Sequence, residues 1–425
     1  MKILILHAHT ANRGDEAAVK AMVDEILKAK PDANITICIN GNTFYPNMPK
    51  QVKQIGRMPK LHSKMALLEF YLFYFTGTKF AMSKECKEFK TELLKSDLVL
   101  HAPGGPSIGD IYSKVEKLYL YRLNLARKLE IPYMFYAPSM GPFNSGKNDN
   151  LRKKVISGAA KVIVRDPISK QYLNQYLPEL QVEQHLDSAL QHDVELQEYD
   201  DIYENYTELK EFIQKHAKCI GITVTDLAWH PTHGKTNLKT LIPDVFHKFV
   251  DEKIAEGYGI VYIPQLYGAN DDTTLMNQFM RQEHTFMLEA NKPEYDAYFQ
   301  QYVIGKLYAV VGMRYHSNIF SAKMGTPFVS ISYEQKMKGF MEKMGLDEYC
   351  IPIEKLTLEC LEDTFDEMCN NYHSYKEKLK EKHLQMKKDS HKTTEDALAI
   401  LEEKNMLEKN KKESENFYEP SRNVL

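Results

Sequence analysis

The sequence predicts an α/β protein with two doubly wound domains. At 425 residues, the chain is too long to fold around a single hydrophobic core. Short apolar strands alternate with amphipathic helices, a pattern typical of parallel sheets that carry helices on both faces. The alternation pauses between residues 187 and 218 and then resumes. We therefore expect an N-terminal domain at residues 1–195, a C-terminal domain at residues 196–355 and a charged helical tail at residues 356–425.

The elements of the first domain follow one another regularly. Apolar runs bounded by polar or turn residues predict strands at residues 2–6, 35–39, 98–101, 133–136 and 161–164. Amphipathic spacing predicts helices at residues 15–28, 86–95 and 115–129. The acidic stretch that begins near residue 194 indicates a connection between the domains.

The second domain repeats the pattern. Strands are predicted at residues 219–223, 260–264, 308–311 and after Pro327, and helices within residues 241–256 and at residues 317–325. From residue 356 the chain is expected to be helical, and from residue 375 Lys and Glu dominate. We expect this tail to be a solvated helix that fades into disorder and carries no chemistry.

Composition excludes several classes of function. Hydrophobic and charged fractions of 43% and 27% are ordinary for a globular protein, and a net charge of -3 gives no basis for nucleic-acid binding. Six scattered cysteines without a pairing pattern fit a reducing compartment. The first residues, M-K-I-L-I-L-H-A-H-T, predict a strand and not a signal peptide, so a cytoplasmic protein is expected.

The most apolar stretch, residues 65–82, is aromatic-rich and too broken by Glu69 to span a membrane. One interpretation is a core or interface helix. The other is a patch that sits in a membrane interface, with Phe73 and Tyr74 among its contacts, which would place the protein peripherally at the inner face of the membrane.

The run from Val310 to Lys336 predicts a binding site. An apolar strand leads into a short turn that carries Arg314 and His316, and a helix is expected to begin near Ser317. Two groups that can be cationic repel each other at a helix N-terminus, and an anionic ligand would relieve that repulsion. This turn therefore favours a pocket for phosphate or carboxylate.

Other unusual residues follow predicted strands, where ligands gather in parallel sheets. Asn12, Gly14 and Asp15 form either a simple helix cap or one wall of a cleft, and the Arg165–Asp166 pair is either a structural ion pair or contributes an anion-binding arginine. The histidines at 230 and 233 lack a third ligand, so no metal site is predicted. The remaining candidates for cleft-lining positions are Gly104, Gly105, Ser139, Gly141 and Asp187.

Together these loops resemble the polysaccharide pyruvyl transferase family. The resemblance covers roughly residues 1 to 345 and rests on motifs in the same order along the chain; Pro106 departs from it, because a third glycine is common there. The motifs are N-x-G-D-x-A at 12–17, the glycine pair at 104–105, S-x-G-P at 139–142, R-D at 165–166, D-x-A at 187–189 and R-x-H-x-x-x-x-x-A-x-x-G-x-P at 314–327, followed by Tyr333 and Lys336.

The resemblance implies a GT-B-like fold, with two Rossmann-like domains facing each other across an active-site cleft. The implied reaction moves the carboxyvinyl unit of phosphoenolpyruvate onto two hydroxyls of a polysaccharide or its lipid-linked precursor, forming a pyruvate ketal and phosphate. No metal or cofactor is implied, with phosphoenolpyruvate as co-substrate. Two alternatives stay open: a GT-B glycosyltransferase that uses a nucleotide-sugar, and a non-catalytic carbohydrate-binding protein of the same fold.

The implied chemistry suggests roles for individual residues. Arg314, Arg165, Lys336 and Ser317 are the candidates for binding the donor, because it carries a carboxylate and a phosphate. His316 is the candidate acid, and Asp15 the candidate base that takes a proton from the sugar. The acceptor is expected on the N-terminal domain and the donor on the C-terminal domain.

Overall fold

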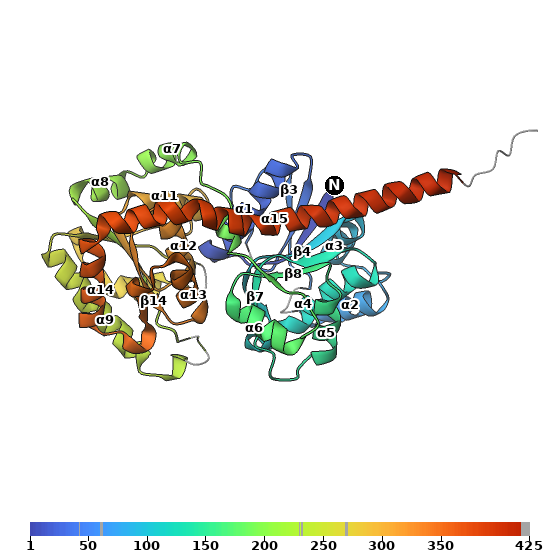
Figure 1. The fold of residues 1–425 in the computed structure, drawn as a ribbon, viewed down its shortest axis with the longest axis horizontal. Coiled ribbons are helices and arrows are strands. Elements are labelled where there is room, and N and C mark those ends of the chain that lie inside the picture. The colour runs from blue at the N-terminus through green and yellow to red at the C-terminus, as the bar shows by residue number, and fades with distance from the viewer. Residues whose placement is uncertain (42, 60–62, 229, 231–232, 268–270, 418–425) are drawn as a thin grey trace, which may run out of the picture.

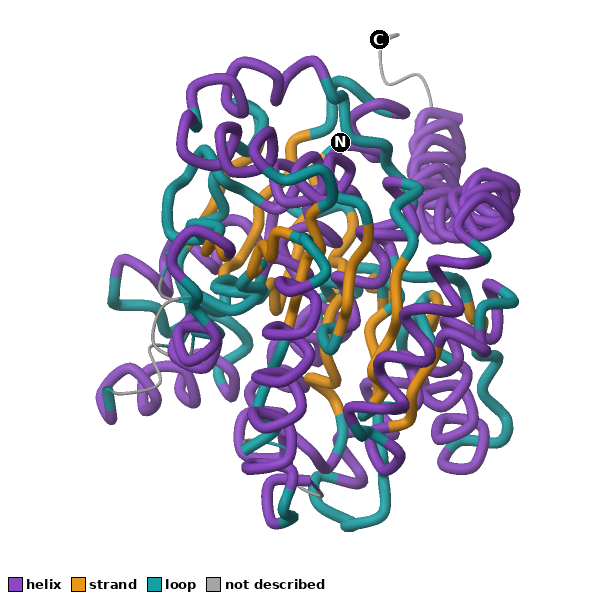
Figure 2. Tube along the Cα trace, turned by 90° about the vertical axis from the view of Figure 1, so that its left-hand side faces the viewer, coloured by secondary structure: helices purple, strands orange, loops and turns teal. Residues whose placement is uncertain are grey.

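The computed structural model describes residues 1–41, 43–59, 63–228, 230, 233–267 and 271–417. It contains two α/β lobes that lie side by side, with one long helix running over both of them (Figure 1). Each lobe has its own parallel sheet with helices on its faces, as the alternation of apolar runs predicts (Figure 2).

The N-terminal lobe is built on a seven-stranded parallel sheet in the order β3-β2-β1-β4-β6-β8-β9. The strands are β1 (Lys2–Ala8), β2 (Asn34–Ile39), β3 (Val52–Ile55), β4 (Leu98–His101), β6 (Tyr133–Phe135), β8 (Lys161–Val164) and β9 (Glu183–Gln184); β5 (Gly104–Ile108) and β7 (Pro138–Met140) form a small separate pair. The helices are α1 (Arg13–Ala29), α2 (Lys64–Phe75), α3 (Lys84–Lys95), α4 (Ser113–Lys128), α5 (Asp149–Ser157) and α6 (Pro167–Tyr176).

The C-terminal lobe carries a six-stranded parallel sheet in the order β12-β11-β10-β13-β14-β15. Its strands are β10 (Cys219–Thr223), β11 (Gly259–Tyr262), β12 (Thr285–Met287), β13 (Ala309–Gly312), β14 (Phe328–Ser332) and β15 (Cys350–Pro352). Its helices are α7 (Gln197–Asn205), α8 (Thr207–Lys215), α9 (Leu238–Ala255), α10 (Thr273–Met276), α11 (Ala297–Lys306), α12 (Tyr315–Met324), α13 (Gln335–Met344) and α14 (Leu358–Asn370).

The predicted strands and helices are found close to their expected bounds, because each apolar run is long enough for only one type of element. α12 begins two residues earlier than predicted, at Tyr315, and Gly325 ends it in the left-handed conformation. The acidic stretch that was interpreted as a connection is largely the helix α7, which buries Tyr199 and Tyr203 against the C-terminal lobe.

The C-terminal tail differs from the prediction of a solvated helix. The 46-residue helix α15 (Tyr372–Phe417) starts on the C-terminal lobe and crosses to the N-terminal lobe, and it is seen nearly end-on in Figure 2. Its Ala397 and Leu401 are each 1% exposed in the core beside β1 and β2. Ser390, Thr393 and Thr394 on the same helix are also fully buried. The burial of such small polar residues cannot be detected from a count of charged residues.

The aromatic stretch at residues 65–82 contains the helix α2, which has one buried face and one exposed face. Phe73 and Tyr74 of α2 are buried, so they are core residues and not the predicted membrane contacts. The opposite face exposes Met65, Leu68 and Phe75, with exposed fractions of 74%, 54% and 71%. No helix within the described part of the chain is long and apolar enough to cross a membrane.

Candidate functional site

The carboxyl ends of strands from both sheets meet around a pocket of about 160 Å³ between the lobes, which we call the interdomain pocket. This is the edge at which ligands bind in parallel sheets. The N-terminal lobe contributes Asn12, Asp15, Gly105, Ile111 and Arg165, and the C-terminal lobe contributes His230, Gln265, Leu266, Arg314, Tyr315, His316, Tyr333, Glu334 and Lys336.

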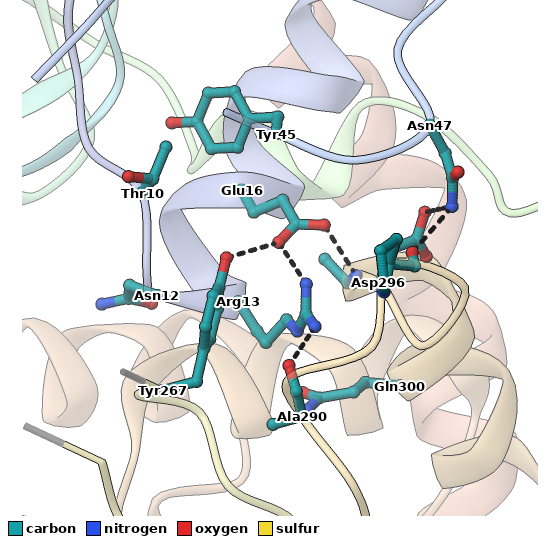
Figure 3. Close-up of polar contacts among 12 residues, drawn as sticks. Thr10, Asn12, Arg13, Glu16, Tyr45, Asn47, Tyr267, Ala290, Asp296 and Gln300 are labelled. Carbon is teal, nitrogen blue, oxygen red and sulfur yellow. Dashed lines mark hydrogen bonds and ion pairs between the residues drawn. The ribbon is translucent and has the colours of Figure 1, made fainter. Parts of the chain in front are cut away.

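The start of α1 is fixed to the C-terminal lobe by a buried polar network (Figure 3). The backbone N–H of Arg13 donates to the carbonyl of Gln265 at 2.9 Å, and the Arg13 guanidinium pairs with Glu16 and donates to the Ala290 carbonyl. Glu16 also accepts from the N–H of Ala297, at 3.0 Å. These bonds set the position of Asn12 and Asp15 relative to α12.

A buried chain of polar groups lies behind the pocket. The Nε of Arg165 donates to the Ser139 hydroxyl at 2.8 Å, and a terminal nitrogen of Arg165 donates to Asp187 Oδ2 at 2.6 Å. The same carboxylate oxygen is 3.6 Å from Nε2 of His316. Asp187 therefore holds a guanidinium on one side and the candidate acid on the other.

Electrostatics keep Asp187 ionised. Burial alone would raise the pKa of Asp187, but Arg165 and then His316 outweigh it and hold that pKa well below its usual range. A carboxylate beside an imidazole can orient the ring for proton transfer. The pair His316–Asp187 is thus suited to proton transfer at the pocket wall.

The close approach of α1 and α12 explains Gly14. A Cβ atom at Gly14 would lie 1.9 Å from Nδ1 of His316, so only glycine lets the imidazole rest against α1. We expect Gly14→Ala to displace His316, destabilise the protein by about 1–3 kcal/mol and lower turnover. Thermal unfolding and kcat are the measurements. Gly56→Ala is the matched control, because Gly56 lies outside the pocket and a Cβ atom there meets nothing within 4 Å; equal effects of the two variants would contradict the steric explanation.

Arg314 lies between the pocket and an acidic partner that the sequence did not indicate. Its guanidinium pairs with Asp272, and its Nε is buried without a hydrogen-bond partner. Burial alone would lower the pKa of Arg314, but Asp272 outweighs it and raises that pKa, so the charge is permanent. A cation with an unused donor suits an anionic ligand.

Lys336 also faces the pocket, on α13 just after β14. Its ammonium pairs with Glu334 and lies 5.6 Å from the centre of the Tyr315 ring. Burial alone would raise the pKa of Glu334, and Lys336 outweighs it, so that this pKa is lowered. The ammonium is held over the pocket by an ion pair within the same turn.

The predicted residues fall into three groups. Asn12, Asp15, Gly105, Arg165, Arg314, His316 and Lys336 line the pocket. Ser139 and Asp187 lie one layer behind it, bonded to Arg165. Gly14, which packs against His316, does not line it, and neither do Ser317, Gly104 and Gly141.

Structural roles account for Ser317, Gly104 and Gly141. The buried Ser317 hydroxyl donates to the Arg314 carbonyl at 2.7 Å. It therefore stabilises the turn and does not line the site proposed for the donor substrate. Gly104 has φ of 145°, and a Cβ atom there would lie 3.0 Å from the Asp15 carboxylate. Gly141 has φ of 94° and packs against Tyr172.

Asn12 has both roles that the sequence left open. Its side-chain oxygen accepts from the N–H groups of Gly14 and Asp15, at 2.8 and 3.3 Å, and so caps α1. It also lines the pocket. Asp166 likewise caps α6 by accepting from Ser169, which leaves Arg165 to pair with Asp187.

The described residues contain one group with metal-like spacing, Glu183, His185 and Asp396. Lys161 already pairs with both carboxylates, so the group is an ion-pair network between β8 and α15. His230 lines the pocket 4.0 Å from Glu334, while Nε2 of His233 is 3.2 Å from the Tyr333 carbonyl.

A second, open hollow of about 510 Å³ adjoins the interdomain pocket and shares Asn12, Leu266 and Arg314 with it. Its wall carries the carboxylates Asp226, Asp271 and Asp272. None of these was a candidate in the sequence, because each lies in a loop without an adjacent motif. Asp272 is paired with Arg314, which lines the same hollow.

Comparisons with known proteins agree with this geometry. UDP-GlcNAc 2-epimerase from Neisseria meningitidis superposes with a TM-score of 0.58 at 13% identity, covering 94% of this chain and 100% of the epimerase. A ugt transferase from Siraitia grosvenorii superposes with a TM-score of 0.52 at 9% identity, covering 95% and 100%. These similarities establish the GT-B arrangement of two Rossmann-like domains.

Sequence comparison identifies the family. The chain is 23% identical over 384 residues to the amylovoran biosynthesis protein AmsJ of Erwinia amylovora, across 84% of this chain and 89% of that protein. The family model for polysaccharide pyruvyl transferase matches residues 12–335, which include every residue of the interdomain pocket except Lys336. The chain therefore belongs to the polysaccharide pyruvyl transferase family.

Proposed function

We propose that this pyruvyl transferase uses phosphoenolpyruvate as its donor and forms a cyclic pyruvate ketal on a sugar. The observation that carries the proposal is the pairing of His316 with Asp187 beside two cationic side chains, Arg314 and Lys336, in one small pocket. Phosphoenolpyruvate carries two anionic groups and an alkene carbon that must be protonated, and the pocket offers a partner for each.

The proposed reaction has two additions to the same carbon, with loss of phosphate between them. His316 donates a proton to the methylene carbon, and the first sugar hydroxyl adds to the neighbouring carbon while losing its proton. The carbon–oxygen bond to phosphate then breaks, and the second hydroxyl adds and loses its proton. One of the two released protons replaces that given by His316, and the other leaves with inorganic phosphate.

The pocket supplies groups for these steps. Arg314 and Lys336 bind the phosphate and carboxylate, and Arg165 supports the same wall while paired with Asp187. Asp15 lines the opposite wall, on the N-terminal lobe, and is our candidate base for the sugar hydroxyl. The acceptor is a sugar of a polysaccharide or of its lipid-linked precursor, bound on the side of the N-terminal lobe.

Phosphate release tests this proposal. Purified protein mixed with phosphoenolpyruvate and a galactose- or mannose-containing acceptor should release inorganic phosphate in step with ketal formation, followed by phosphorus and carbon NMR. A nucleotide-sugar donor would place its diphosphate at the start of the same helix, α12, so the two donors are compared directly. Thermal stabilisation by a nucleoside diphosphate, with none from phosphoenolpyruvate, would contradict the proposal.

Arg314→Ala should weaken binding of phosphoenolpyruvate by about a hundredfold or more, because a charge-assisted contact to the donor is lost. The protein should stay folded, since Asp272 Oδ2 still accepts from the N–H groups of Gln265 and Leu266, each at 3.0 Å. Isothermal titration measures the affinity. Arg281→Ala removes an arginine elsewhere in the same lobe, paired with Asp251, and serves as the control; unchanged donor affinity in Arg314→Ala would remove this residue from the site.

We further propose that the protein acts in the cytoplasm at the inner face of the membrane. The six cysteines are free, as a reducing compartment requires. The exposed apolar face of α2 is flanked by the exposed lysines Lys64, Lys79 and Lys84, which would meet anionic headgroups.

Replacing Leu68 and Phe75 together with serine should lower binding to anionic liposomes by about tenfold to a hundredfold, because the transfer of two large apolar side chains is lost. Liposome sedimentation is the measurement. Leu384→Ser is the control, since Leu384 is 57% exposed on α15, far along the chain from α2. Equal sedimentation of all three proteins would exclude α2 as a membrane contact.

A further inference from the structure

A second set of cationic and imidazole groups lies in the N-terminal lobe, outside the interdomain pocket. It contains Arg57, Arg122, His7, His9 and His101, with Asn40 and Tyr119 among them, and we call it the arginine–histidine cluster. His7, Asn40 and His101 stand at the carboxyl ends of β1, β2 and β4, the edge where a parallel sheet binds ligands.

Neither arginine has an acidic partner among the described residues. Arg122 is 1% exposed, and its Nε donates to the Met58 carbonyl at 2.7 Å. Arg57 donates to the Asn40 carbonyl, and its Nε is buried without a hydrogen-bond partner. In the described part of the chain, no carboxylate forms an ion pair with either guanidinium, although buried charges are ordinarily paired.

The surrounding side chains leave further donors unused. His7 is 1% exposed, and neither of its ring nitrogens has a hydrogen-bond partner. Its ring lies 4.4 Å from that of Tyr119 and 4.7 Å from that of His101, between centroids. Burial, with His101 and Arg122 nearby, holds the pKa of His7 well below its usual value, so no proton needs a counter-ion there.

The cluster is partly open to solvent. Arg57 and His9 are partly exposed, so a ligand has access. Nε2 of His9 is 3.4 Å from the Tyr119 hydroxyl and 3.5 Å from Nδ2 of Asn40. Burial lowers the pKa of His9, and the negative charge of Asp15, a residue of the interdomain pocket, partly offsets this effect.

We propose that the arginine–histidine cluster binds a phosphate or diphosphate group carried by the sugar acceptor. This inference rests on the proposed function, in which the acceptor occupies the N-terminal lobe. Two guanidiniums with neutral imidazole, amide and phenol groups can share the three terminal oxygens of a phosphate. The substrate class is then a sugar phosphate or a sugar diphosphate conjugate.

Titration with inorganic pyrophosphate tests the site without any turnover. Arg57→Gln should weaken pyrophosphate binding by about ten- to a hundredfold, as expected for one lost charge-assisted contact. The loss should be the same in wild-type protein and in an Arg314→Ala background, where the donor pocket is impaired. Arg127→Gln is the matched control: Arg127 lies on α4 with Arg122 but donates to Asn124.

Unchanged affinity in Arg57→Gln, or an effect that disappears in the Arg314→Ala background, would overturn the site. A competition experiment tests the ligand class: a sugar 1-phosphate should displace pyrophosphate from the Arg314→Ala protein, whereas the free sugar should not. Displacement by inorganic anions alone would overturn the assignment to the acceptor. Because these are binding measurements, they stay decisive even if phosphoenolpyruvate proves not to be the donor.

Discussion

His316→Gln is expected to lower kcat by about a hundredfold to ten-thousandfold, because general acid catalysis contributes an effect of that size. Glutamine occupies the space against Gly14 but cannot deliver a proton at neutral pH. Phosphoenolpyruvate should still bind, since Arg314 and Lys336 are unchanged. Steady-state phosphate release measures kcat, and calorimetric titration measures donor affinity.

His230→Gln is the matched control for this variant. His230 lines the same pocket but faces Glu334 and not Asp187. If His230→Gln lowered kcat as much as His316→Gln does, proximity to Asp187 would not be what makes His316 the acid. An unchanged kcat in His316→Gln would exclude this residue as the acid.

Asp187→Ala is expected to destabilise the protein by about 3–5 kcal/mol, because Arg165 is left buried beside an imidazole with no counter-charge. Turnover should fall as well, since His316 loses the carboxylate that lies beside its ring. Urea unfolding measures the stability. Asp166→Asn changes a neighbouring buried carboxylate that accepts from the N–H and the hydroxyl of Ser169 at the start of α6, so its cost should be closer to about 1 kcal/mol.

The same carboxylate predicts the pH dependence of stability. The pKa of Asp187 is depressed in the folded protein, so its stabilising contribution is fully present above the unfolded value of about 3.9 and is lost as pH falls toward the folded value. Asp187→Asn should therefore unfold with a weaker dependence on pH below about 4. Identical acid profiles for the two proteins would show that Asp187 is not the group that loses its charge.

The sequence was sufficient for the parallel sheets and for one face of the pocket. Arg314 and His316 could be predicted because a buried strand, a turn and a helix start follow one another within a few residues, so local pattern decides the geometry. Gly14 was predicted to line the cleft but lies behind the pocket, where His316 packs against it. That contact joins positions about 300 residues apart, so no local pattern contains it.

Contacts between distant segments account for what the sequence missed. Asp272 pairs with Arg314 from a loop after β11, and nothing in its neighbours marks it as a partner. Ser317 has a suitable side chain at a suitable position, yet its hydroxyl is used by the Arg314 carbonyl. The tail was predicted from its Lys and Glu content, whereas its packing depends on a narrow stripe of Ser, Thr, Ala and Leu that composition averages away.

The path of α15 ties the terminal segment to catalysis. The hydroxyl of Ser390 donates to the Asp187 carbonyl at 2.6 Å, and Asp389 accepts from the N–H of Leu186 at 3.0 Å. The described residues of α15 do not line the pocket, yet these bonds hold the backbone that carries Asp187, the partner of His316. Proteolytic cleavage or a disruptive fusion near residue 389 would leave the pocket residues in place but remove the bonds that position Asp187. We therefore expect an active preparation to need an intact α15.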